Sequence, residues 1–333
     1  MRWNPVTAGA SLVAVAIACG VAAGPVRAQL NSPSMRGDLG LKAGSQAPPG
    51  GYVFAPLYLY SADVLKDRAG DVVARGQVDS ALFGVGVSVV TARTIAGGTY
   101  GFTVVIPGAN NRLQGGRIDE DPGAGLTDIF VQPITLGWRS PRTDVIAGYG
   151  LYVPTGRFGD AEEGDTGLGM WAHEFLAGTT VYLDAARLWH AATTATFVVH
   201  SDKRDTELRA GPVLNLEGGV GHDFLGGGLS AGLAYYASWK VGDDRLPPRA
   251  DVLVRGRNRV FAVGPEVSMA LAWKRTVYGS VTARYQWETG ARVATEGGAF
   301  NLLVNVLMRP LHLPAPSAPA SRSSLSGTRG GRS

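Results

Sequence analysis

The sequence predicts an all-β fold, a closed antiparallel transmembrane β-barrel of about 12 strands. Three observations support this fold. Only 17% of the residues are charged. Apolar and polar residues alternate along segments of about ten residues, and the connections between segments alternate between long and short. The chain also holds 47 glycines among 333 residues, which favours short strands and tight turns over long helices.

The first 28 residues have the three parts of a secretory signal peptide. Arg2 supplies the positive start, residues 6–21 form a short apolar core, and small residues flank Arg27 at the cleavage position. We expect a cut after Ala28. An uncleaved anchor and a lipoprotein signal ending at Cys19 are the alternatives. Cys19 is the only cysteine, so a chain cut after Ala28 holds no disulfide and no thiolate metal site.

The net charge of +4 does not describe the part of the chain that we expect to fold. Five of the 31 basic residues lie in the first 28 residues or after residue 310, which leaves 26 basic against all 27 acidic residues. A nucleic-acid-binding domain needs a basic footprint on its folded surface. Nucleic acid is therefore excluded as a predicted partner.

Composition divides the chain into four parts. They are a signal peptide (1–28), a Pro- and Gly-rich periplasmic lead-in or plug segment (29–50), an outer-membrane β-barrel (51–310) and a disordered tail (311–333). The tail is predicted to be disordered because its Ser, Pro, Arg and Gly residues cannot bury enough apolar surface. The lead-in, from residue 36 onward, is a candidate to fold into the barrel lumen.

Alternation is clearest in residues 208–220, 277–288 and 300–309, where every second position is apolar. A soluble sandwich alternates as well, but here aromatic residues such as Tyr285 and Trp287 lie near the segment ends, as in the girdles of membrane barrels. We therefore place the apolar positions toward lipid and the polar positions toward the lumen. An Arg or Lys facing the bilayer midplane would cost roughly 2–4 kcal/mol. Residues 168–181 mix both kinds, and their faces are not assigned.

The lengths of the connections give the strand count and the orientation. Long connections are predicted near 61–77, 107–126, 154–167, 200–207, 241–255 and 289–298, and short ones near 92–97, 139–142, 182–186, 221–226 and 272–275. Membrane barrels of this kind carry long loops outside and short turns on the periplasmic side. The count therefore places both ends of the barrel chain on the periplasmic side.

The polar positions supply ten candidate lumen-lining residues: Arg209, Asn215, Glu217, Lys240, Glu266, Arg284, Gln286, Glu288, Asn301 and Asn305. Two interpretations stay open. The side chains form a network of ion pairs and hydrogen bonds that fills the barrel, or they line a pore and set its selectivity.

No catalytic residue, metal site or cofactor is predicted. His190 and His200 share a strand face, but ten residues at about 3.3 Å each separate them by about 33 Å, too far to share a metal ion. Ser230 and Ser268 lie on polar faces without the Gly-x-Ser-x-Gly elbow of a serine hydrolase. A membrane-embedded hydrolase is the weakest functional alternative.

Several blocks of sequence, taken in their order and spacing, resemble the phenol meta-pathway degradation family of outer-membrane β-barrel transporters over residues 36–310. The blocks are RGDLGLKAGSQAPPGGYVFAPLYLYSAD (36–63), GLTDIFVQPITLGW (125–138), YVPTGR (152–157), VGPEVS (263–268), RYQWETGAR (284–292) and GGAFNLLVNV (297–306). The resemblance implies passage of small, poorly soluble aromatic compounds across the outer membrane. It does not imply that the protein performs degradation chemistry. The chain departs from the pattern at its end, because Met308 and Arg309 precede a tail where such barrels usually finish on an aromatic residue.

We therefore predict a non-enzymatic outer-membrane channel or transporter for small hydrophobic compounds, aromatic ones included, linked to phenol-type degradation pathways. The alternatives are a closed structural or adhesive barrel without transport, and the hydrolase. The predicted partners are outer-membrane lipid and lipopolysaccharide, the barrel-assembly machinery and a small hydrophobic solute.

Overall fold

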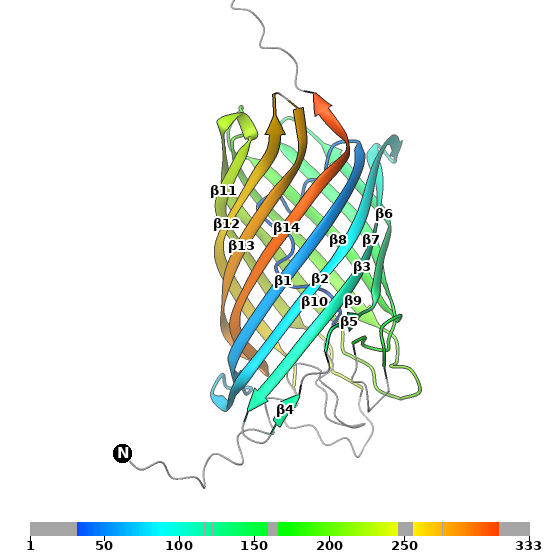
Figure 1. The fold of residues 1–333 in the computed structure, drawn as a ribbon, viewed down its shortest axis with the longest axis vertical. Helices are drawn as coiled ribbons and strands as arrows, with labels where there is room; N and C mark the ends of the chain where they lie inside the picture. The colour runs from blue at the N-terminus through cyan, green and yellow to red at the C-terminus, as the bar shows by residue number, and fades with distance from the viewer. Residues whose placement is uncertain are drawn as a thin grey trace, which may run out of the picture.

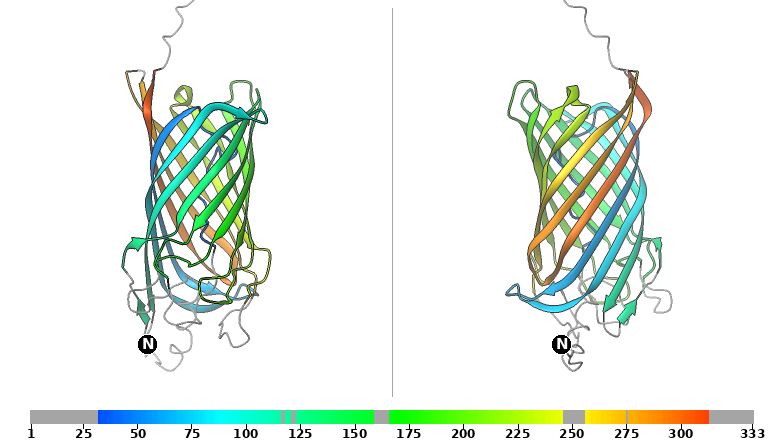
Figure 2. Two further views of the ribbon diagram at one scale, coloured as in Figure 1. Left: turned by 90° about the vertical axis from the view of Figure 1, so that its right-hand side faces the viewer. Right: turned by 60° about the vertical axis from the view of Figure 1, so that its left-hand side comes forward.

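The computed structural model describes residues 32–115, 118–120, 123–158, 166–245, 256–274 and 276–312. These residues form one closed antiparallel barrel whose strands tilt strongly against the long axis (Figures 1 and 2). The predicted signal peptide and almost all of the predicted tail lie outside the described residues. Within those ranges, no helix is long and apolar enough to cross a membrane.

Twelve strands form the ring. They are β1 (Gly50–Lys66), β2 (Val72–Ile95), β3 (Gly98–Gly115), β6 (Ile129–Arg139), β7 (Thr143–Val153), β8 (Ala172–Tyr182), β9 (Trp189–His200), β10 (Val213–Phe224), β11 (Leu229–Lys240), β12 (Arg259–Trp273), β13 (Thr276–Arg292) and β14 (Ala294–His312). Two short strands, β4 (Ile118–Glu120) and β5 (Gly125–Leu126), pair with β3, and a single 3-10 turn, η1 (Leu225–Gly227), joins β10 to β11. The predicted count of about twelve barrel strands is confirmed.

The ring closes because its first strand pairs with its last. The register between β1 and β14 runs from Tyr52 opposite Leu307 to Lys66 opposite Ala294. Each unpaired peptide group in hydrocarbon costs several kcal/mol, so a sheet that faces lipid is stable only without free edges. Closure satisfies that requirement.

The two faces of the wall are those of a membrane barrel. On β13, Arg284, Gln286 and Glu288 are buried in the interior, whereas the alternate residues Tyr285 and Trp287 are 39% and 57% exposed on the outside. The same alternation holds in β8 (residues 172–182), whose faces could not be assigned from the sequence. There every second residue from Ala172 to Tyr182 points inward.

The strand order gives the barrel two different ends. The short-turn end carries the turns β2–β3, β6–β7, β8–β9, β10–β11 and β12–β13, together with Gly50 and His312. The long-loop end, at the bottom of Figure 1, carries the other connections. The longest of these follow β3, β7, β9 and β11.

The predicted long connection at 61–77 is wrong in length, because only residues 67–71 separate β1 from β2. Asp67 makes this tight turn possible. Its Oδ1 atom accepts the backbone N–H groups of Ala69, Gly70 and Asp71 at 2.8, 2.9 and 3.0 Å. The polar residues within 61–66 and 72–77, which were predicted to lie in a loop, belong to β1 and β2 instead.

The predicted long connection at 289–298 is also wrong. Val293 alone separates β13 from β14, and its φ of 51° closes the turn. The polar residues of this stretch pair across strands. Lys66 Nζ lies 2.5 Å from Glu296 Oε1, across the seam between β1 and β14. Polarity here reflects strands that extend past the apolar belt rather than a loop.

Candidate functional site: the lumen and the segment that crosses it

Eight of the ten predicted lumen residues are buried on the inner face of β10 to β14. They are Asn215, Glu217, Lys240, Glu266, Arg284, Gln286, Glu288 and Asn301. Asn305 lies on the same face of β14 as Asn301 and is half-buried. The wall therefore presents carboxylates, amides and cations to an interior that bulk water reaches poorly.

Arg209 corrects the prediction, because it does not lie on the barrel wall. It is exposed in the connection between β9 and β10, and its Nε atom donates to Asp202 Oδ1 at 2.7 Å. The alternation that pointed to a strand comes from packing at the barrel mouth. Leu208 and Ala210 turn toward Met170 in a small apolar cluster, which leaves Arg209 facing solvent.

Residues 32–49 run through the barrel interior and enter β1 at Gly50; we call them the lumen segment (Figures 1 and 2). At the long-loop end, Ser32 Oγ lies 3.2 Å from His200 Nε2, on the last residue of β9. Toward the short-turn end, Arg139 donates to the carbonyl oxygen of Gln46. The segment therefore crosses the lumen from one end to the other.

Two wall carboxylates hold the backbone of the lumen segment at mid-barrel. Glu217 accepts the N–H of Gly37 at 2.9 Å and the N–H of Leu39 at 3.0 Å. Glu266 accepts the N–H of Leu41, with both of its oxygens at 3.3 Å. Hydrogen bonds to a charged acceptor are the strong ones among protein hydrogen bonds, so these contacts fix the path of the segment.

Arg284 joins the same site from β13. Its Nε donates to Glu266 Oε2 at 2.6 Å, and its Nη1 donates to the carbonyl oxygen of Gly37. The guanidinium therefore forms an ion pair with Glu266 and also a hydrogen bond with the backbone of the lumen segment. Asp38 of the segment lies within electrostatic range of Arg284 and beside Glu217.

Glycines let the segment lie close to the wall. A Cβ at Gly40 would overlap the side chains of Arg284 and Glu266, and one at Gly44 would overlap the backbone of Thr179 on β8. Gly37 has a φ of 76°, a conformation that other residues rarely adopt. Glycines therefore stand in the lead-in where a side chain would overlap the inner wall of the barrel.

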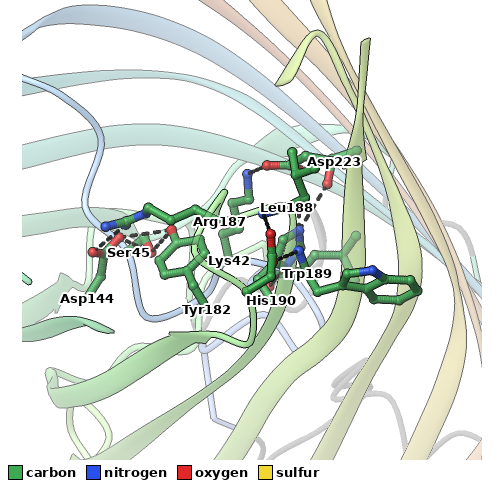
Figure 3. A network of polar contacts seen from close by, with 12 residues as sticks. Lys42, Ser45, Asp144, Tyr182, Arg187, Leu188, Trp189, His190 and Asp223 are labelled. Carbon is green, nitrogen blue, oxygen red and sulfur yellow. Dashed lines mark hydrogen bonds and ion pairs between the residues drawn. The ribbon is translucent and has the colours of Figure 1, made fainter. Parts of the chain in front are cut away.

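A polar network fastens the segment near the short-turn end (Figure 3). Lys42 Nζ lies 2.5 Å from Asp223 Oδ2, and Ser45 Oγ donates to Asp144 Oδ2 at 2.8 Å. Arg187 supports the second contact, because its Nη2 lies 2.7 Å from Asp144 Oδ1. Its guanidinium also lies 3.7 Å from the centre of the Tyr182 ring.

His190 in this network resembles part of a serine hydrolase site but has a different geometry. Ser230 Oγ lies 3.5 Å from Nε2 of His190, and Asp223 Oδ1 lies 3.3 Å from the same nitrogen. A Ser-His-Asp relay needs the two partners on different ring nitrogens. Here Nδ1 faces the carbonyl oxygen of Leu41 at 3.2 Å, so the histidine holds the lumen segment. Among the described residues, no group of three or more His, Cys, Asp or Glu side chains is placed to bind a metal ion.

At the long-loop end, Asp128 organises the connection between β7 and β8. Its Oδ1 accepts the N–H of Gly156 at 3.1 Å, and its Oδ2 accepts the N–H of Leu168 at 2.9 Å. Burial raises the pKa of the Asp128 carboxyl above its usual value, although these two hydrogen bonds act in the opposite direction. The carboxyl fixes both ends of this connection over the mouth of the barrel.

Sequence reasoning missed the residues that hold the segment near the strand ends. Asp144, Tyr182 and Asp223 lie at or beside positions predicted as short turns, where polar residues are usual. Tyr60 and Tyr236, whose hydroxyls donate to Glu288 inside the barrel, were missed as well, because tyrosine was counted among the apolar residues. One signal was present in the sequence. Lys42 is the only lysine of the glycine-rich lead-in, and a lysine that lies in a polar lumen needs a carboxylate partner there.

The outer wall carries a groove of about 480 Å³. Its lining residues are Leu59, Tyr60, Ser61, Asp79, Ser80, Ala81, Asn110, Arg112, Tyr285, Gly298 and Phe300. The outward-facing apolar members Leu59, Tyr285 and Phe300 adjoin the apolar belt, and the polar members lie on the side of the long-loop end. The groove is therefore amphipathic and lies where an aromatic girdle marks the membrane interface.

A solved outer-membrane channel has a similar architecture. The crystal structure of the COG4313 outer membrane channel from Pseudomonas putida F1 superposes with a TM-score of 0.67 at 14% identity, over 79% of this chain and 97% of that one. The β domain of the Bordetella autotransporter BrkA gives a TM-score of 0.43 at 11% identity, over 77% of this chain and 99% of that one. No curated protein sequence matches the chain significantly. Residues 62–304 match a family model, and the chain therefore belongs to the family described as "Putative MetA-pathway of phenol degradation".

Proposed function

We propose that this protein is an outer-membrane channel for small hydrophobic compounds, aromatic ones among them, and that the lumen segment holds it closed. One observation carries the proposal. The lumen segment crosses the barrel from end to end, and Glu217, Glu266 and Arg284 of the wall form hydrogen bonds with its backbone. By the usual orientation of such barrels, the long-loop end faces outward and the short-turn end faces the periplasm.

The space that the segment fills suits an apolar solute. Leu41 is 2% exposed, and its side chain lies against Gly219, Gly221 and Gly232 of β10 and β11. These glycines carry no side chain, so withdrawal of Leu41 would leave an apolar hollow in a polar lumen. Ligand sites commonly combine such an apolar surface with a few placed polar groups.

Family membership supports the choice of solute, because the family description refers to phenol degradation. We further propose that the chain is exported with cleavage after Ala28, is inserted by the barrel-assembly machinery and is not an enzyme. The amphipathic outer groove, whose lining includes Arg112 and Phe300, is our proposed contact for lipopolysaccharide.

The test compares uptake of radiolabelled toluene by intact cells that carry lipopolysaccharide and either the protein or an empty vector. We expect faster uptake with the protein and no change for a hydrophilic solute of similar size. Planar-bilayer recording of the purified chain provides the second readout. The Glu217→Ala/Glu266→Ala variant should open more often than the wild type.

A closed structural or adhesive barrel is the second candidate, and the number of wall contacts along the lumen segment favours it. It predicts equal toluene uptake with and without the protein. It also predicts no current from the wild type or from the double variant. That pair of results would overturn the channel proposal.

A further inference from the structure

Glu288 lies at the centre of a tyrosine-lined box on the inner wall. Its side chain is 0% exposed. The hydroxyl of Tyr60 donates to Oε2 at 2.7 Å, and the hydroxyl of Tyr236 donates to Oε1 at 2.6 Å. The N–H of Gly297 donates to Oε2 at 2.9 Å. Both carboxyl oxygens are acceptors, which is the pattern of an ionised carboxylate.

The box is aromatic as well as anionic. Tyr58 and Tyr60 lie almost parallel, with an interplanar angle of 2° and ring centroids 6.4 Å apart. Both rings are buried, and so is Tyr236, which is 1% exposed. Aromatic rings attract a delocalised cation placed within about 6 Å of the ring centroid, and a carboxylate adds the counter-charge. The residue types and their arrangement are those of an organic-cation site.

Arg36 of the lumen segment is the cation beside this box. Its Nη1 atom lies 3.9 Å from Glu288 Oε1, which is longer than a hydrogen bond, and its side chain is 31% exposed. It also lies within electrostatic range of Tyr58, Tyr60 and Tyr236. The buried carboxylate is therefore only partly compensated, since its three hydrogen-bond donors are neutral.

The hydrogen bonds of the neighbouring backbone explain why Arg36 lies no closer to Glu288. The next residue, Gly37, has its N–H held by Glu217 and its carbonyl oxygen held by Arg284, so the backbone cannot move toward Glu288. A free guanidinium has no such restraint. It can approach a carboxylate oxygen to about 2.7–2.9 Å.

We propose that Tyr58, Tyr60, Tyr236 and Glu288 form a binding site for small organic cations of the guanidinium class, which Arg36 occupies in the closed barrel. A cation that enters the box displaces Arg36 and removes one of the contacts of the lumen segment. The site is distinct from the proposed passage of hydrophobic compounds, because it selects a charge that those compounds lack.

The test is calorimetric titration of the purified full-length chain with ethylguanidinium, which reproduces the end of the side chain that Arg36→Ala removes. We expect Arg36→Ala to bind ethylguanidinium at least tenfold more tightly than the wild type does. The matched control is Arg93→Ala, which removes an exposed guanidinium at the end of β2, outside the lumen segment, and should leave the affinity at the wild-type level. Ethylurea, a neutral probe of similar shape, should not bind.

The decisive variant combines Glu288→Gln with Arg36→Ala. It should bind ethylguanidinium at least tenfold more weakly than Arg36→Ala does. If that variant does not fold, as judged by its heat-modifiable migration on a gel, Glu288→Asp replaces it. The shorter side chain withdraws the carboxylate and must weaken binding. A folded Arg36→Ala variant that does not bind ethylguanidinium would overturn the proposal. So would equal binding of ethylurea, or affinity that is unchanged in the Glu288 variants. None of these readouts depends on transport, so failure here is distinguishable from failure of the channel proposal.

Discussion

Removal of the Glu217 carboxylate is the sharpest test of how the lumen segment is held. In Glu217→Ala, the N–H groups of Gly37 and Leu39 lose acceptors that lie at 2.9 and 3.0 Å. Hydrogen bonds to a charged group contribute about 1.5–3 kcal/mol each. We take the lower end of that range for each of the two hydrogen bonds. The held state then loses about 3 kcal/mol.

At about 1.4 kcal/mol per factor of ten, that loss shifts the balance between held and released segment by about 100-fold. Single-channel recording measures the shift as open probability. Glu217→Gln is the control, since its amide oxygen still accepts an N–H, and its effect should be several-fold smaller. An open probability in Glu217→Ala equal to that of the wild type would refute the view that this carboxylate holds the segment.

Four further outcomes are expected. Gly44→Val forces a side chain into the backbone of β8 and should cost about 1–3 kcal/mol, measured by urea unfolding with a gel-shift readout. Arg284→Ala leaves Glu266 without its ion-pair partner and should cost about 3–5 kcal/mol in the same assay, whereas removing both side chains should cost less than the sum of the two single changes. Val267, 46% exposed on the outer face of β12, should tolerate Leu, but Val267→Arg should cost about 2–4 kcal/mol and reduce insertion into liposomes. The raised pKa of Asp128 means that the folded state binds its proton more tightly than the unfolded state does. The Asp128 carboxyl therefore stabilises the folded state at a pH below about 3.9, the ordinary pKa of aspartate. This stabilisation is lost as the pH rises through the pKa of the folded state. Asp128→Asn should abolish that dependence, and protease cutting of the β7–β8 connection between about pH 3 and pH 7 measures it.

The barrel and its faces were predictable where alternation is regular, as along β13, because a two-residue period fixes which side chains point inward. β8 resisted the same reasoning for a physical reason. His173 lies on the outer face and makes a 2.7 Å hydrogen bond to the hydroxyl of Tyr149, with Phe175 beside the tyrosine ring. A paired polar residue on the lipid side hides the period that the sequence would otherwise show.

The contacts of the lumen segment were beyond sequence reasoning. Its composition points to a glycine-rich segment without regular structure, but its partners lie far away along the chain: Glu217 is 180 residues from Gly37, and Arg284 is 247 residues away. No local period selects Glu217 over Glu174, which also faces the interior. Only the closed ring, which sets the height of each strand, brings a given carboxylate to a given peptide group.

The seam between β1 and β14 has a consequence for the order of assembly. The first strand cannot find its partner until the last strand exists, so the ring is incomplete for as long as the chain is being delivered. The lumen segment precedes that first strand and touches strands from both halves of the barrel, so it must be in place when the seam closes or be threaded through afterwards. Either route makes long-range pairing the slow event of folding. A chain cut short before β14 would expose two unpaired edges and leave its N-terminal segment without an enclosed space to occupy.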